Sequence, residues 1–536
     1  MTAFWQDLRY AARTMARRPG FTLVAVLTLA LGIGANTTVF LWIKAILLQP
    51  LPGVPASRDV VEVAGLHETR GRQNLSYQLY LDLRDRNSVL SGLAVHYMQG
   101  VGLTGEGEPE RAWAELVSVN AFDVLGVRPL LGRFFLREED HLPLGEPVAV
   151  ISYRLWRRRF GGDQGAVGAV LTVNGQGYTV IGVAPEGFAG GFTGLAFDLW
   201  VPVTRQPHLV PGGAWIGPGG GRWLEGFGRL APGVTPVQAQ AQLSALSLAS
   251  ATLRGPQDSE VGTVTVRYLG DSTGGAESVL GPLLLALLAL VGILFLVTCA
   301  NVAGLIAVRS ADRRREFAVR LSMGSSGRRL ARLLVGEVLL LASLAGALAS
   351  LAAVWGATLL PSMIPRLDMP VAFDLRPDPT VYLFTFGLSV LAGLLCALPS
   401  VQRATRVEIA QELRHGVNRI STTRRQRWER DLLVGAQIAL STALLFAAGL
   451  FLRSVAAARG SDPGFNPRGV LLASIDLFPA GVTEEEGLAI YRRLLDRLAA
   501  LPGVEAASLS RRVPLSFGGS ESTIIDVPGY APPANN

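Results

Sequence analysis

Long runs of apolar residues divide this chain of 536 residues into candidate membrane-spanning segments and polar segments. A helix needs about 20 consecutive apolar residues to cross the hydrocarbon region of a bilayer. Five runs reach this length, and the first is too long to be the apolar part of a cleaved signal peptide. The pattern therefore predicts five spans: Phe21–Leu48, Val279–Val308, Leu333–Leu360, Val381–Val401 and Leu432–Leu452.

The positions of the arginines predict how these spans are oriented. Arginines gather in residues 1–20, in the loop 309–332 and in the linker 402–431, whereas aspartates offset the few arginines of 361–380. Loops rich in Lys and Arg stay on the cytoplasmic side of a membrane. The N-terminus and both arginine-rich loops are therefore expected in the cytoplasm. Residues 49–278 and 453–536 are expected outside it.

Residues 1–20 have the pattern of an amphipathic helix on the cytoplasmic surface of the membrane. One face carries apolar side chains at helical spacing: Trp5, Leu8, Ala12 and Met15. A second face carries basic side chains: Arg9, Arg13 and Arg17. Such a helix is suited to the inner leaflet, whose anionic headgroups attract arginine, and Pro19-Gly20 ends it. The alternative interpretation is a plain charged flank of the first span.

The polar segment 49–278 alternates between strand and helix patterns, which predicts a mixed α/β domain. Strands are expected at the following residues: Val60–Leu66, Leu93–Tyr97, Pro147–Ser152, Val170–Val173, Tyr178–Val183 and Trp223–Leu230. Asn174-Gly175 is a hairpin turn signal between two of them. One helix is expected at Tyr77–Arg86, and a second begins at Thr235, which has Pro236 and Gln238 at the positions of a capping box. The expected fold is an α-helical transmembrane bundle with a large extracytoplasmic α+β domain.

The last part of the chain repeats this opening design. A basic flank and an apolar span precede residues 453–536, where Thr483 and Glu486 form a second capping box. The helix that follows is expected to end near Leu501-Pro502-Gly503, and Val504–Ser510 is expected to form a returning strand. We interpret 453–536 as the start of a second, incomplete extracytoplasmic domain, and we expect the chain to be a fragment of a longer duplicated protein.

Composition excludes several kinds of chemistry. Lys44 is the only lysine and has no glycine loop before it, so the chain has no Walker A phosphate-binding motif. The five histidines lack metal-ligand spacing, and Cys299 and Cys396 both lie in apolar runs, where small packing roles are expected. No motif for a nucleophile, a metal or a cofactor is present. We therefore expect neither an enzyme nor a nucleic-acid-binding protein.

The loop 309–332 carries the most informative motif. Glu316 and Arg320 form an i, i+4 pair in the favourable order, while Phe317 shares another face with Leu321. Gly324 stands at the position that commonly ends a helix. The pattern predicts a short amphipathic helix that docks on a partner protein. The alternative is a solvated arginine-rich loop that only sets topology.

With Arg314, Glu316, Arg320 and Gly324, this loop resembles that of the FtsX-like/MacB-like permease superfamily of ABC transporters. Further similar motifs are Val117–Phe122, Leu125–Pro129, Leu131–Arg133, Val148–Ser152 and Leu155–Phe160. Five further motifs narrow the resemblance to one group of this superfamily, the duplicated orphan permeases of acidobacteria. These motifs are Asp7–Tyr10, Arg18–Phe21, Leu31–Asn36, Gln437–Ser441 and Pro463–Phe465. The resemblance covers essentially the whole chain, except that the family has two halves of four spans each.

The resemblance implies an inner-membrane permease subunit that a separate cytoplasmic ATPase drives. It places the ATPase contact at Arg314, Glu316, Phe317, Arg320 and Gly324, and it implies a periplasmic core domain with porter-like βαβ units and a β-rich insert. The resemblance is also compatible with a homodimer and with a periplasmic partner protein. It implies no cofactor and no metal.

Two other functions compete with this interpretation. The same cytoplasmic helix and extracytoplasmic domain also suit a signalling or cell-envelope regulatory protein of the FtsX type that moves no substrate. The third interpretation is that the chain is a nonfunctional fragment of a longer permease. Within the third span, Glu337 is expected to form a structural ion pair with Arg332 or Arg329, because a proton relay needs further acidic residues in the spans.

Overall fold

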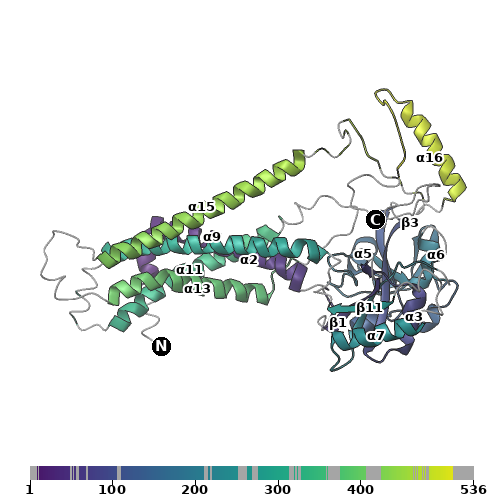
Figure 1. Cartoon of the computed structure of the whole chain (residues 1–536), viewed down its shortest axis with the longest axis horizontal. Coiled ribbons are helices and arrows are strands. Elements are labelled where there is room, and N and C mark those ends of the chain that lie inside the picture. Colours follow the sequence, from purple (N-terminus) through teal and green to yellow (C-terminus); the bar gives the residue numbers. More distant parts are fainter. Residues whose placement is uncertain are drawn as a thin grey trace.

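The computed structural model places the five apolar runs in long helices and gathers the strands in a separate α+β domain (Figure 1). The structure describes the following residues: 9, 11–48, 51, 53–55, 59–67, 71–104, 110–210, 215–217, 220–250, 262–268, 276–312, 319, 323, 327–357, 359, 375–405, 424–460 and, with gaps, 462–510.

The five long helices each contain a segment that is long and apolar enough to cross a membrane. Their bounds are α2 (Pro19–Ile43), α9 (Ala276–Asp312), α11 (Gly327–Ala357), α13 (Pro379–Thr405) and α15 (Arg424–Gly460). A π-helical turn, η1 (Lys44–Leu48), continues α2. The segments long enough to span are Pro19–Leu48, Gly281–Ser310, Arg329–Ala357, Pro379–Leu398 and Val434–Ala457.

Four of these helices form a bundle in which α2 and α13 each pack against both α9 and α11. Their shared core consists largely of alanines, with both cysteines among them. A Cβ atom on Gly32 would overlap Thr298, and one on Gly346 would overlap Ser389. Small residues let helix backbones approach closely, which is how apolar helices associate when no water drives them together.

Hydrogen bonds between polar side chains also join the long helices. Asn36 Nδ2 donates to the carbonyl oxygen of Val291 at 2.8 Å, and the hydroxyls of Thr37 and Thr385 lie 3.1 Å apart. Asn301 accepts a hydrogen bond from Gln437 of α15. Such interhelical hydrogen bonds are a common way in which polar side chains join helices in membranes.

The α+β domain contains one sheet of eleven strands. The bounds are β1 (Val60–His67), β2 (Gly71–Gln73), β3 (Leu90–Thr104), β4 (Glu110–Val117), β5 (Leu131–Gly132), β6 (Val148–Ile151), β7 (Val170–Val173), β8 (Gln176–Val183), β9 (Leu199–Pro202), β10 (Glu225–Leu230) and β11 (Thr263–Tyr268). The strand order is β11-β1-β10-β3-β4-β9-β6-β8-β5, with β2 beside β1 and with β7 beside β3 and β8.

Two interleaved βαβ units form one half of the sheet. Helix α3 (Tyr77–Arg86) connects β1 to β3, and helix α7 (Pro236–Ser250) connects β10 to β11. Because β10 is antiparallel to both β1 and β3, and β1 is antiparallel to β10 and β11, each helix joins two parallel strands that a third strand separates. This is the split βαβ arrangement of ferredoxin-like folds. The porter-like βαβ units are confirmed.

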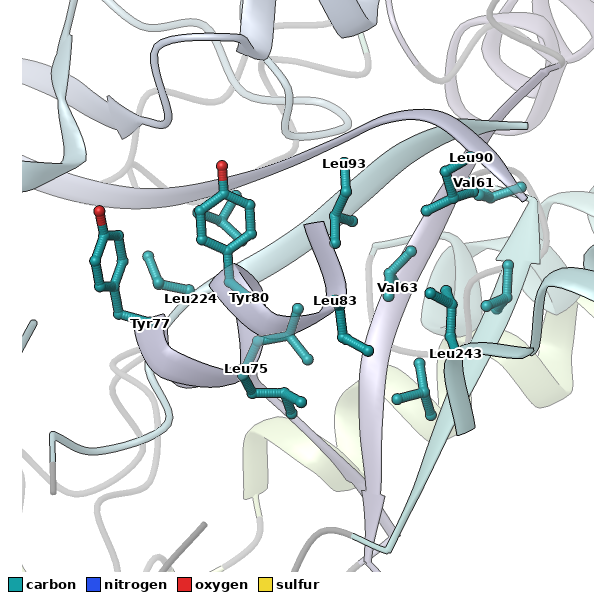
Figure 2. Close-up of a cluster of buried hydrophobic side chains, with 14 of the residues drawn as sticks. Val61, Val63, Leu75, Tyr77, Tyr80, Leu83, Leu90, Leu93, Leu224 and Leu243 are labelled. Carbon is teal, nitrogen blue, oxygen red and sulfur yellow. The ribbon is translucent and has the colours of Figure 1, made fainter. Parts of the chain in front are cut away.

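The apolar core of this half lies between the sheet and the two helices. Figure 2 shows Tyr80 and Leu83 of α3 beside Leu93 of β3, with Leu243 of α7 beside strand residue Val63. All five side chains are buried. Ser76 caps α3 because its hydroxyl accepts the amide hydrogen of Leu79, at 3.1 Å.

The β-rich insert occupies the chain between β3 and β10. Its strands are β4 to β9, and its helices are α4 (Ala121–Leu125), α5 (Tyr153–Arg159), α6 (Gln206–Leu209), η3 (Arg137–Glu139), η4 (Gln164–Ala166) and η5 (Val203–Arg205). Two further apolar cores stabilise it, one rich in aromatic side chains around Phe122 and Trp200 and one on strands around Val180. The hairpin turn expected at Asn174-Gly175 is confirmed, since both residues have positive φ angles of 47° and 79°.

One detailed expectation is wrong. Residues 504–510 form no strand, and the helix before them, α16 (Glu484–Ala499), packs on no sheet among the described residues. Near the N-terminus, residues 11–16 are helical, with Met15 buried in the protein and Ala12 exposed. The position of this helix on the membrane surface stays a prediction; Trp5 and Leu8 lie outside the described residues.

Candidate functional site: the helix ends that flank the arginine-rich loop

The motif residues expected to contact an ATPase lie outside the described residues. These are Arg314, Glu316, Phe317, Arg320 and Gly324. The structure does describe the two helices that lead into and out of the loop, because α9 ends at Asp312 and α11 begins at Gly327. Within the loop, the amide of Met323 donates to the carbonyl oxygen of Val319 at 3.1 Å. This bond has the i to i+4 spacing of an α-helical hydrogen bond.

A buried ion pair joins α9 to α11 close to this loop. Arg309 Nη1 lies 3.1 Å from Glu337 Oε1, and both side chains are less than one tenth exposed. The Arg309 guanidinium also lies over the ring of Phe21, at 4.6 Å from its centroid. Since Phe21 belongs to α2, this arginine of α9 contacts two other helices.

This arrangement matters because α9 and α11 pack mainly on α2 and α13 and little on each other. The ion pair is therefore a direct link between the two helices that the loop connects. A buried charge that loses its partner is strongly unfavourable, so the pair resists separation of the two helix ends. Together with the contact to Phe21, it connects α2, α9 and α11.

The sequence pointed to Glu337 but not to the partner Arg309 that the structure shows. Arg329 and Arg332 lie within about two turns of Glu337 on its own helix, whereas the partner in the structure, Arg309, comes from the preceding span. Arg309 lies three residues before the end of α9, whereas Glu337 lies ten residues after the start of α11. Counting residues from the loop would therefore not have paired them, and the packing of the helices decides the contact.

A small cavity of about 20 Å³ lies beside the pair. Its lining includes Arg309, Glu337, Phe21 and Ser310. This volume holds about one water molecule, and its polar lining offers the hydrogen-bond partners that a buried water needs. The space is far too small for an organic substrate.

A second ion pair joins α2 to α13 at the opposite end of the bundle. Lys44 Nζ, in the π-helical turn η1, lies 2.7 Å from Asp378 Oδ2. Asp378 also caps α13, because its Oδ1 accepts the amide hydrogen of Val381 at 3.1 Å. Burial opposes the ionisation of Asp378, but the hydrogen bonds from Lys44 and Val381 outweigh it and lower the pKa of the carboxyl. The sole lysine of the chain therefore has a structural role.

The α+β domain contains a buried histidine whose partners are all structural. His96 Nδ1 lies 2.7 Å from Glu115 Oε1. The carboxylate of Glu115 also accepts hydrogen bonds from the Gly191 amide at 3.0 Å and from Trp200 Nε1 at 2.6 Å. Because Glu115 is 1% exposed, this network holds the loop around Gly191 against the sheet. Among the described residues, no cluster of three or more His, Cys, Asp and Glu side chains is suited to hold a metal ion.

Comparison with known families identifies both parts of this architecture. The family profile described as "MacB-like periplasmic core domain" matches residues 22–246, and the profile "FtsX-like permease C-terminal" matches residues 288–409. Together the two profiles span well over half of the chain. The second match includes the arginine-rich loop and both residues of the Arg309–Glu337 pair.

Individual proteins are similar to parts of the chain. The macrolide export ATP-binding/permease protein MacB of Bdellovibrio bacteriovorus is 24% identical over 287 residues, which cover 54% of this chain and 41% of that protein. The chain thus matches about two fifths of the length of this curated relative.

Solved structures are also similar to part of the chain. The periplasmic region of MacB from Actinobacillus actinomycetemcomitans has a TM-score of 0.31 at 16% identity and covers 42% of this chain and 92% of that chain. The extracellular domain of the noncanonic ABC-type transporter YknZ from Gram-positive bacteria has a TM-score of 0.28 at 13% identity, with coverage of 39% and 99%. A domain of a putative permease protein from Porphyromonas gingivalis has a TM-score of 0.30 at 17% identity, with coverage of 40% and 92%.

Both family matches agree with an architecture in which long apolar helices carry one large extracytoplasmic α+β domain. The chain has multiple candidate spans, and the family supplies the permease component of ABC transporters and not a catalytic subunit. This chain belongs to the FtsX-like/MacB-like family of ABC transporter permeases.

Proposed function

We propose that this chain is the permease subunit of an ABC-type exporter or mechanotransmission system in the bacterial inner membrane. In this proposal a separate ATPase binds the loop 309–332 on the cytoplasmic side. The N-terminus and the linker 402–431 lie on that same side, in keeping with their arginines. Closure of the ATPase moves the loop, and the long helices carry the movement to the extracytoplasmic domain.

The Arg309–Glu337 pair is the observation that carries this proposal. Arg309 lies three residues before the end of α9, and its bond to Glu337 joins the helix that enters the loop to the helix that leaves it. Through Phe21 it also reaches α2, whose far end leads into the α+β domain. A force on the loop is therefore delivered to three helices together and is not absorbed by bending of one helix end.

The proposal is tested by isolating the chain with its ATPase. Cells producing the tagged full-length chain are expected to yield a co-purifying ATP-binding protein, and Glu316→Lys or Arg320→Glu is expected to remove it. Arg419→Glu is the matched control, because it makes the same charge change in the other arginine-rich segment. If no ATP-binding protein associates with or without nucleotide, or if the control variant loses it equally, the proposal is wrong.

The role of the ion pair is tested separately from binding of the ATPase. Arg309→Ala and Glu337→Gln are expected to keep the ATPase bound, since neither residue lies in the docking motif. They are expected to abolish the movement of the extracytoplasmic domain that nucleotide causes, measured as a change in distance between spin labels on α7 and α9. Arg309→Lys keeps the charge and is expected to restore part of that change.

A further inference from the structure

The two cysteines of the chain meet inside the bundle. They are 97 residues apart in sequence, Cys299 on α9 and Cys396 on α13, and they are the only cysteines present. Both are buried, at 4% and 0% exposure. Each was expected to be a small packing residue, and the contact between them depends on how α9 and α13 pack.

The contact brings the thiol of Cys396 against the backbone of Cys299. The Sγ atom of Cys396 donates to the carbonyl oxygen of Cys299, with 3.4 Å between the sulfur and the oxygen. Standard bond lengths place a carbonyl oxygen about 2.4 Å from its own Cα atom, so this sulfur lies within about 6 Å of the Cα atom of Cys299. A disulfide requires the two Cα atoms to lie about 4.4–6.8 Å apart, so only a small approach of the two residues is needed.

The surrounding packing allows such close approach without steric obstruction. The neighbours of the two cysteines in the shared core include Ala303, Ala392 and Ala397, whose side chains are single methyl groups. Helices lined by small residues pack at short distances in membranes.

We propose that Cys299 and Cys396 form an oxidation-sensitive dithiol that closes to a disulfide and locks α9 to α13. In this reaction both S–H bonds break and one S–S bond forms. The two electrons and two protons pass to a lipid-soluble quinone, which becomes a hydroquinone. A quinone is the fitting oxidant because it dissolves in the hydrocarbon region that surrounds these buried thiols.

The lock would act on the helix that leads into the arginine-rich loop. Helix α9 ends at Asp312, where the loop begins, and α13 follows the third span. A bond between them holds the second and fourth spans in one relative position. The formation of this bond does not depend on the ATPase, so it can be tested whether or not the proposed function is correct.

The test uses the full-length chain in lipid nanodiscs, treated with a short-chain quinone. The treated protein is denatured and then labelled with a maleimide. Wild-type protein is expected to lose both reactive thiols and to yield a peptide pair joined through Cys299 and Cys396 in mass spectrometry. Its thermal unfolding midpoint is expected to rise by roughly 5 °C and to return on treatment with dithiothreitol.

The matched control moves one thiol around the helix at the same depth. Cys396→Ala combined with Ala397→Cys keeps two buried thiols but turns one of them about 100° away. This variant is expected to keep both thiols reactive under the same treatment. The proposal is overturned if wild type keeps both thiols, if the control cross-links equally well, or if the midpoint of the oxidised protein fails to rise.

Discussion

Helices α7 and α16 begin with the same local signal but have different surroundings. Thr235 and Gln238 form a reciprocal capping box at the start of α7, and Thr483 and Glu486 form one at the start of α16. Leu243 of α7 is fully buried between α3 and the sheet, whereas Leu488 of α16 is 51% exposed. In Figure 1 α7 lies on the sheet and α16 stands apart from it.

The spans that precede the two domains differ in the same way. Half of the most apolar segment of α2 is buried within the protein, whereas none of the most apolar segment of α15 is buried. The comparison teaches that capping and apolar length are enough to form a helix, while burial requires partner elements. In the first unit α7 has the sheet as its partner, and α2 has the bundle. In the described part of the repeat, α15 contacts α9 but is not enclosed.

The largest expected difference between α7 and α16 is in the stability lost when one leucine of each helix is truncated. Leu243→Ala should destabilise the α+β domain by about 2–5 kcal/mol, because it removes buried methyl groups and leaves a cavity. Leu488→Ala should change stability by less than about 0.5 kcal/mol. Chemical denaturation of the full chain in detergent, followed by tryptophan fluorescence, measures both. Equal losses in the two variants would show that α16 is buried after all.

A smaller effect is expected from enlarging a glycine in each span. Gly32→Val on α2 drives a side chain into Thr298 and should cost about 1–3 kcal/mol. Gly449→Val on α15 is the control, since nothing lies within 4 Å of a Cβ atom there. Thermal unfolding in detergent should show a lower midpoint for the first variant alone. A similar drop for Gly449→Val would mean that α15 also packs tightly.

The smallest effect on overall stability comes from removing one cap at a time. Thr235→Ala should lower the stability of the domain by about 1 kcal/mol while α7 stays helical, because its packing holds it in place. Thr483→Ala should leave the main unfolding transition unchanged. It should instead speed amide hydrogen exchange in the first turn of α16, since a helix of this length without tertiary support is marginal in water. Unchanged exchange in α16 would contradict the comparison.

Much of the fold followed from local patterns. The bounds of α3 and β7 agree residue for residue with their predictions, and the hairpin turn at Asn174 was recognised from two residues. These features depend on neighbours in sequence, such as a cap hydroxyl, a run of alternating burial or a residue that tolerates positive φ. The strand expected at 504–510 failed because a strand needs a second strand beside it, and no local pattern supplies one.

The candidate site was only half predictable for the same reason. Glu337 was conspicuous in the sequence because a carboxylate in a span needs a partner. Its partner Arg309, the ring of Phe21 and the meeting of Cys299 with Cys396 come from different helices. The relative depth and rotation of helices decide such contacts, and side-chain packing sets both.

The sequence by itself determined the number of long apolar helices, the domain inserted between the first two, and the positions of the capped helix ends. Each of these depends on the hydrophobicity, spacing or hydrogen-bonding capacity of residues that are close together along the chain. The tertiary structure decided which helices share the bundle, how the two βαβ units interleave and which buried groups meet. Those features depend on the shape of surfaces that exist only once the elements have packed.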